Sequence, residues 1–138
     1  MQQHFVCNNG YTAALCRTQM DVLREVLGRY PAGDLGEWTW VLVRSEDWKP
    51  IKRRLRLDPD SPAFSFLERR ETFIEEALVA PVPGRSAELI TQWSSSIDDL
   101  LTLAITHELG HALCNEADEH KADAYGRLLR AGRLHVCR

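Results

Sequence analysis

The chain has 138 residues, a net charge of −3, and hydrophobic and charged fractions of 44% and 27%. These values are ordinary for a soluble globular protein, and the length suits one domain over residues 1–138 with a real hydrophobic core. The slightly acidic balance gives no indication of nucleic acid binding. No apolar run approaches the roughly 18 residues of a membrane span, so we expect no such span.

Four cysteines lie at positions 7, 16, 114 and 137. None forms a Cys-x-x-Cys pair, which argues against a thiolate zinc site. The even number allows two disulfides, for instance Cys7 with Cys16 and Cys114 with Cys137, and equally allows four reduced, buried thiols. Disulfides would indicate an extracytoplasmic compartment, and reduced thiols a cytoplasmic one. The first residues lack the basic and apolar regions of a signal peptide.

The first elements are predicted by periodicity and by residue type. Apolar residues at near-helical spacing predict a helix over 12–30, with Thr12 as its N-cap. Turn-forming residues end this helix: Pro31, Gly33 and Gly36. The segment 38–44, WTWVLVR, is aromatic and β-branched, which favours a strand.

The middle of the chain is harder to interpret. Three prolines interrupt the segment 45–64, where we expect an irregular excursion with one helical turn around 48–55. The basic run 52–56 within it is expected on a solvated face or loop. The segment 71–79 fits a helix or a strand by pattern alone. A short helix is expected over 87–93.

Two helices are predicted near the C-terminus. Ser96 is a suitable N-cap, and acidic residues at 98 and 99 favour the positive end of a helix dipole over 97–114. Asn115 can end this helix in a left-handed turn. A last helix is expected over 118–130, with Asp118 as its N-cap.

The longer of these helices contains the motif His-Glu-x-x-His, as His107, Glu108 and His111. Residues i and i+4 share one helical face, so both imidazoles can reach one metal ion. Glu108 lies one step around the helix and can contact a water on that ion, which is the arrangement used by zinc hydrolases. A glycine inside a helix lowers its stability, so Gly110 indicates that another segment passes close to the helix at this position.

A catalytic zinc usually has three protein ligands, and several downstream residues compete for the third place. Carboxylates in the turn, Glu116 and Asp118, are expected to be solvated or to cap a helix. Glu119 and Asp123 share a helical face, so Glu119 could bind zinc while Asp123 holds a ligand histidine by a hydrogen bond. His120 remains the alternative third ligand, although it points about 100° away from Glu119.

With these residues the sequence resembles the gluzincin metallopeptidases, which carry HExxH on one helix and a ligand glutamate on a later helix, often as ExxAD. The matching residues lie between about 97 and 129: His107, Glu108, His111, Glu119, Ala122 and Asp123. By size the chain is most similar to the small soluble minigluzincins. Only seven residues (112–118) separate the second histidine from the glutamate here, fewer than in many gluzincins. The resemblance implies one Zn²⁺ ion held by His107, His111 and Glu119.

The resemblance also implies a fold of the α+β class. This fold is a zincin-like single domain with an N-terminal backing helix, a small twisted mixed β-sheet, the active-site helix and a C-terminal glutamate helix. An edge strand of such a domain lines the cleft and binds peptide as an added strand. Residues 12–30 would be the backing helix and 38–44 a strand. For this reason we interpret 72–79 as a strand that forms the edge of the cleft.

These expectations describe a zinc-dependent peptidase acting on a peptide or protein substrate. The metal would lower the pKa of a water and polarise the scissile carbonyl, while Glu108 takes the water proton and delivers it to the leaving amine. Two alternatives stay open: a catalytically inactive zincin-like module that binds a protein or peptide, and a hydrolase of non-peptide amides. A histidine or cysteine of the tail 134–138 folding over the metal would give latency. A frayed end or a Cys114–Cys137 staple are the competing interpretations.

Overall fold

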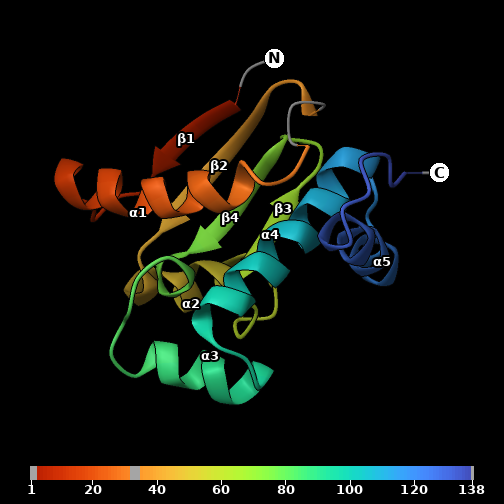
Figure 1. The fold of residues 1–138 in the computed structure, drawn as a ribbon. Helices are drawn as coiled ribbons and strands as arrows, with labels where there is room; N and C mark the ends of the chain where they lie inside the picture. The colour runs from red at the N-terminus through yellow and green to blue at the C-terminus, as the bar shows by residue number, and fades with distance from the viewer. Residues whose placement is uncertain (1–2, 32–34, 138) are drawn as a thin grey trace.

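The computed structural model describes residues 3–31 and 35–137, so Gly33 of the expected helix end lies outside the described residues. In chain order the elements are β1 (Gln3–Cys7), α1 (Ala13–Leu27), β2 (Trp38–Val43), α2 (Ser45–Arg54), β3 (Ala63–Phe66), β4 (Glu71–Glu75), the 3-10 turn η2 (Glu76–Leu78), α3 (Arg85–Trp93), α4 (Ile97–Cys114) and α5 (Glu119–Arg130). The described residues thus form five α-helices and a mixed sheet of four strands, in agreement with the expected α+β class (Figure 1).

The sheet has the strand order β1-β2-β4-β3. β1, β2 and β4 are parallel, and β3 runs antiparallel to β4. Residues of β2 alternate between two apolar layers. One side of β2 packs with α1 and α4 through Trp38, Trp40 and Leu42. The other side packs with Trp48 of α2 through Val41 and Val43. Helices therefore cover both faces, with α1 and α4 on the same one (Figure 1). No helix in the described ranges is long and apolar enough to cross a membrane.

The prediction that residues 72–79 form the edge of the cleft is wrong. The strand in this region, β4, ends at Glu75 and continues as η2, and it lies between β2 and β3. The edge strand is β3, which begins at the end of the segment 45–64 that was expected to be irregular and extends beyond it to Phe66. Its four residues are too few to give a clear period. Pro62 precedes it directly and Pro59 lies three residues earlier, so turn signals outweigh the strand signal.

The basic run 52–56 is only partly solvated, contrary to expectation, because α2 is a full helix and not a single turn. Lys52 is 2% exposed, whereas the next four residues are exposed. The Lys52 ammonium lies 5.4 Å from the ring centre of Trp48 and 5.1 Å from that of Phe64. Burial lowers the pKa of Lys52. Aromatic faces thus take the place of solvent around this cation.

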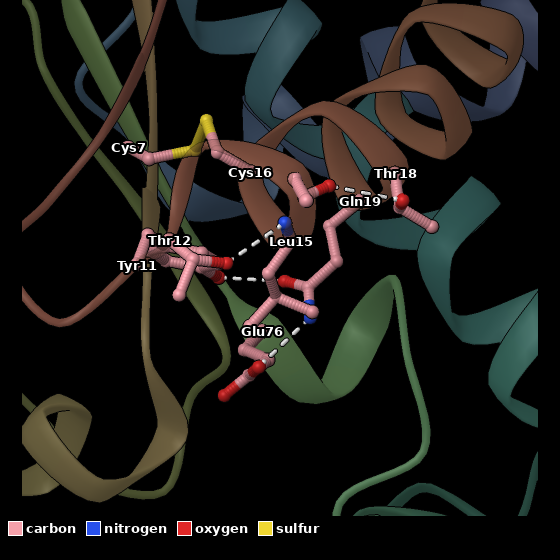
Figure 2. The surroundings of a disulfide bond; sticks show 9 residues. Cys7, Tyr11, Thr12, Leu15, Cys16, Thr18, Gln19 and Glu76 are labelled. Carbon is pink, nitrogen blue, oxygen red and sulfur yellow. Dashed lines mark hydrogen bonds between the residues drawn. A yellow bond between two sulfur atoms is a disulfide. The ribbon is translucent and has the colours of Figure 1, made fainter.

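The structure contains the two disulfides named as one possibility in the sequence, Cys7–Cys16 and Cys114–Cys137, and not four reduced thiols. The first joins β1 to α1 beside a chain of polar side chains that Figure 2 shows. In this chain the Tyr11 hydroxyl donates to Gln19 Oε1 (2.7 Å), and Gln19 Nε2 donates to Glu76 Oε2 (2.8 Å). Thr12 caps α1 by accepting from the Leu15 amide, as expected.

Glu76 is the centre of this network. Its Oε1 accepts from Arg44 Nε (2.9 Å) and from the Ser45 amide (3.2 Å), so one carboxylate links α1, the end of β2 and η2. Burial raises the pKa of Glu76, but the hydrogen bonds from Gln19 and Arg44 outweigh burial and hold the pKa below its usual value. The folded state therefore favours the charged form of this side chain.

Glu76→Gln is expected to lower the free energy of unfolding by about 1–3 kcal/mol at neutral pH, because charge-assisted hydrogen bonds are lost. A carboxyl whose pKa is depressed by folding stabilises the protein above the unfolded-state pKa. This contribution disappears as the pH falls through the folded-state pKa. The difference between wild type and variant should therefore shrink below about pH 4.3. Denaturant unfolding from pH 3 to 7 measures it. Glu25→Gln, at an exposed ion pair with Arg29, is the control and should change stability by less than about 0.5 kcal/mol.

Candidate metal centre

The two helices that carry the motif residues begin and end where the sequence predicts. Ser96 caps α4 by accepting from the Asp99 amide (3.2 Å), and Asn115 ends the helix in the left-handed conformation (φ 47°, ψ 48°). Asp118 caps α5 by accepting from the amides of His120 and Lys121. These local signals fix the helical phase, and the phase decides which side chains can meet.

Small residues let α5 approach α4 closely. A Cβ atom on Gly110 would lie 2.4 Å from the Ala122 carbonyl oxygen, and one on Gly126 would lie 3.0 Å from the Thr106 carbonyl oxygen. Ala122 is fully buried at this contact. The glycine inside the motif therefore has the packing role expected for it, and the seven-residue connection is long enough to bring α5 back onto α4.

This approach places three electron-donating side chains together. Nε2 of His107 lies 3.2 Å from Nε2 of His111. The carboxylate of Glu119 lies 3.0 Å from each of these nitrogens, through Oε1 and Oε2. His107, His111 and Glu119 thus form a group that could hold a metal ion. His120 does not belong to the group and is exposed.

The separations suit a small cation with nitrogen and oxygen ligands. Tetrahedral ligands about 2.0–2.2 Å from a zinc ion lie about 3.3–3.6 Å from one another. The donor atoms here lie 3.0–3.2 Å apart, within a few tenths of an ångström of that spacing. Two imidazole nitrogens with one carboxylate form a ligand set that borderline metals such as zinc favour.

A main-chain carbonyl orients one of the two imidazoles. Nδ1 of His111 lies within hydrogen-bond distance of the main-chain carbonyl of Glu116. Because a carbonyl only accepts, the neutral ring carries its proton on Nδ1, and Nε2 presents a lone pair. That lone pair faces a carboxylate oxygen, so two acceptors point at each other and a cation between them would satisfy both. Nδ1 of His107 faces Asp123 Oδ1 at 3.7 Å, which is too long for a direct hydrogen bond.

Glu108 occupies the inner side of the site. It is 4% exposed, and its Oε1 accepts a hydrogen bond from the Ser65 hydroxyl (2.8 Å). Burial raises the pKa of the Glu108 carboxyl, while the nearby imidazoles and the Ser65 hydrogen bond act in the opposite direction. The motif predicts Glu108 beside the metal ligands. No pattern in the sequence marks Ser65, which reaches the site only because β3 pairs with β4.

Two cavities open beside these residues. The smaller, about 270 Å³, is mostly apolar and includes Trp93, Leu103 and Ala104 next to His107 and Glu108. The larger, about 980 Å³, follows the residues of β3 and reaches Glu108, His111 and Glu119. The candidate metal centre therefore lies at this larger cavity, a groove that has β3 as one wall.

Buried donors hold the segment that leads into this wall. Trp48 Nε1 and Lys52 Nζ both donate to the Ser61 carbonyl, at 2.8 and 3.0 Å. Arg85 Nη2 donates to the Asp60 carbonyl at 3.2 Å. Burying the Lys52 ammonium, which the sequence placed in solvent, thus fixes the main chain beside the groove.

The C-terminal tail does not reach the metal ligands in the described part of the chain. Cys137 is joined to Cys114, Val136 is buried, and His135 is exposed and outside the candidate metal group. The staple interpretation of the tail therefore fits the structure, and a tail histidine over the metal does not.

Gly110→Ala is expected to separate α5 from α4, because the new methyl would meet the Ala122 carbonyl oxygen at 2.4 Å. Overpacking of this kind costs about 1–3 kcal/mol. It should also weaken the binding of a metal ion at the candidate centre, since Glu119 moves with α5. Thermal unfolding and zinc titration measure the two effects. Gly28→Ala is the control, because its Cβ would meet only the main chain of its own helix, at 3.2 Å. Equal effects of both variants would contradict this explanation.

Comparison of the chain with protein-family models, with curated proteins and with solved structures finds no match. The assignment of a function to this site therefore depends on its residues and their geometry.

Proposed function

We propose that the protein is a zinc-dependent peptidase with a zincin-like fold, most similar to the gluzincins. The observation that supports this best is the convergence of His107, His111 and Glu119, with the Glu108 carboxylate buried beside them at an open groove. A structural metal site does not need a carboxylate at that position. A hydrolytic site does, because a base must accept a proton from the attacking water.

A zinc ion held by the three ligands would act as a Lewis acid that acidifies a water and polarises the scissile carbonyl. Glu108 accepts the proton of the attacking water and delivers it to the leaving amine. Its burial suits this role, since a raised pKa favours holding the proton between the two transfers. The Glu116 carbonyl orients His111, so the lone pair of its Nε2 is set before the metal binds, while Asp123 faces Nδ1 of His107 at 3.7 Å.

The substrate is a peptide that binds as an added strand along β3. In an antiparallel pair, residues that share hydrogen bonds alternate with residues that do not. The Glu75 amide donates to the Pro62 carbonyl, which makes that pair a bonded one. By alternation, the main-chain groups of Ala63 and Ser65 face away from β4 and toward the groove. No strand in the described residues pairs with this edge of β3. A peptide could therefore bond to these groups.

We also propose that the protein acts outside the cytoplasm, because disulfides such as its two form and persist in oxidising compartments.

The test is cleavage of a peptide library by the zinc-loaded protein, with products identified by mass spectrometry. The expected result is cleavage that a chelator stops and that added zinc restores. Stoichiometric zinc with no cleavage of any peptide would overturn the peptidase proposal in favour of a binding module. The absence of zinc binding would overturn both the zinc peptidase and the zinc-containing binding module.

A further inference from the structure

A continuous chain of hydrogen bonds crosses three strands and ends on Glu108. Trp38 Nε1 on β2 lies 3.0 Å from Thr72 Oγ1 on β4. Thr72 Oγ1 lies 2.8 Å from Ser65 Oγ on β3, its partner in the strand register. Ser65 Oγ lies 2.8 Å from Glu108 Oε1 on α4. Trp38 and Thr72 are 2% and 0% exposed, so water does not compete for the bond between them, while Ser65 is partly buried.

The direction of each bond follows from the hydrogens available. The indole N–H of Trp38 only donates, so Thr72 Oγ1 accepts from it. An ionised carboxylate only accepts, so the single hydroxyl hydrogen of Ser65 points to Glu108. The remaining contact must then run from Thr72 to Ser65. Each hydroxyl accepts one bond and donates one, and bonds aligned in this way polarise one another.

We propose that Trp38, Thr72 and Ser65 form a relay, meaning a chain in which each hydrogen bond is donated toward Glu108. This relay positions the Glu108 carboxylate for catalysis, an inference that rests on the proposed peptidase function. Among the described residues, only Ser65 hydrogen-bonds this carboxylate, and it occupies Oε1. Oε2 is left for the attacking water. Ser65 does not touch the reacting atoms in this scheme. It fixes the rotation of the base, and Thr72 and Trp38 fix Ser65.

The relay also links the base to the wall along which the substrate binds. Ser65 contributes its side chain to Glu108, while its main chain faces the groove. The same residue therefore sets the base and one peptide contact. Loss of the Ser65 hydroxyl alone should disturb the position of Glu108 and spare the contact with the peptide, because the main chain of β3 is kept.

The decisive comparison is Thr72→Val against Thr72→Ser in the zinc-loaded protein. Valine has the shape of threonine without the hydroxyl, whereas serine keeps the hydroxyl. Thr72→Val should lower kcat about 10–100-fold, the range seen when a partner that orients an active group is removed, with KM changed less than about twofold. Thr72→Ser should retain most of kcat. Thr18→Val is the control, because its hydroxyl bonds only the Ala14 carbonyl within α1.

Ser65→Ala is the second variant, in case Thr72→Val fails to fold with the Trp38 N–H left unpaired. It should lower kcat as much as Thr72→Val, and the double variant should be no worse than either, because one break already disconnects the relay. Equal losses in Thr72→Val and Thr72→Ser, or additive losses in the double variant, would overturn the relay.

Crystal structures of the metal-free variants test positioning without any activity. The relay requires the Glu108 carboxylate to leave its wild-type position in Thr72→Val and to keep it in Thr72→Ser. An unmoved carboxylate in Thr72→Val would overturn the relay even in an active enzyme. Failure of the wild-type protein to cleave any peptide would overturn the proposed function, and the structures would still decide on the relay.

Discussion

Replacing Glu108 with glutamine should reduce peptide cleavage by about 10²–10⁴-fold, the usual contribution of a general base. Glutamine has nearly the same shape and can still accept the hydrogen bond from Ser65, but it cannot take a proton at neutral pH. The three candidate ligands are unchanged in this variant. Zinc content and thermal unfolding should therefore stay close to wild type while kcat falls.

A matched control separates the loss of a base from the loss of any negative charge. Glu46→Gln removes an exposed carboxylate in the first turn of α2 and should leave cleavage unchanged. Rates measured on one cleaved peptide, with zinc quantified in the same samples, give the comparison. Near wild-type cleavage by Glu108→Gln with full zinc occupancy would remove Glu108 from the mechanism.

Glu119→Ala should weaken zinc binding by about 100-fold or more. Loss of a group that merely supports a ligand already costs about 10–100-fold in metal affinity, and a ligand should matter at least as much. His120→Ala should leave the affinity within about twofold, because His120 is exposed and its side chain is not among the converging donors. Competition titration against a chelating dye measures both affinities. The opposite ranking would make His120 the third ligand and would require α5 to rotate.

The parts of the fold that could be predicted are those that depend on interactions between residues close together in the sequence. The caps at Thr12, Ser96 and Asp118 act on amides two or three residues away, so the sequence alone indicates where the helices begin. The same holds for the relation between His107 and His111, which depends only on the pitch of one helix. Once the phase of α5 is known, Glu119 is the side chain that turns toward the pair.

The parts that could not be predicted depend on pairing between distant segments. β3 is only four residues long, so its own pattern is a weak signal. It is a strand because its main chain pairs with that of β4. The interpretation of residues 72–79 as the edge of the cleft follows from the family resemblance and not from a pattern in β3. The contact between Ser65 and Glu108 spans 43 positions in the chain and has no signature in either segment. Burial of Lys52 likewise requires the Ser61 carbonyl and two aromatic rings to be in place.

On the proposed function, His107, His111 and Glu119 together hold one zinc ion. Anomalous diffraction at the zinc edge, on crystals grown with one equivalent of zinc, tests it most directly. The expected result is one anomalous peak about 2.0–2.2 Å from both Nε2 atoms and from a Glu119 oxygen. A peak bound elsewhere, or no peak in crystals whose protein is otherwise intact, would contradict zinc binding by these three residues.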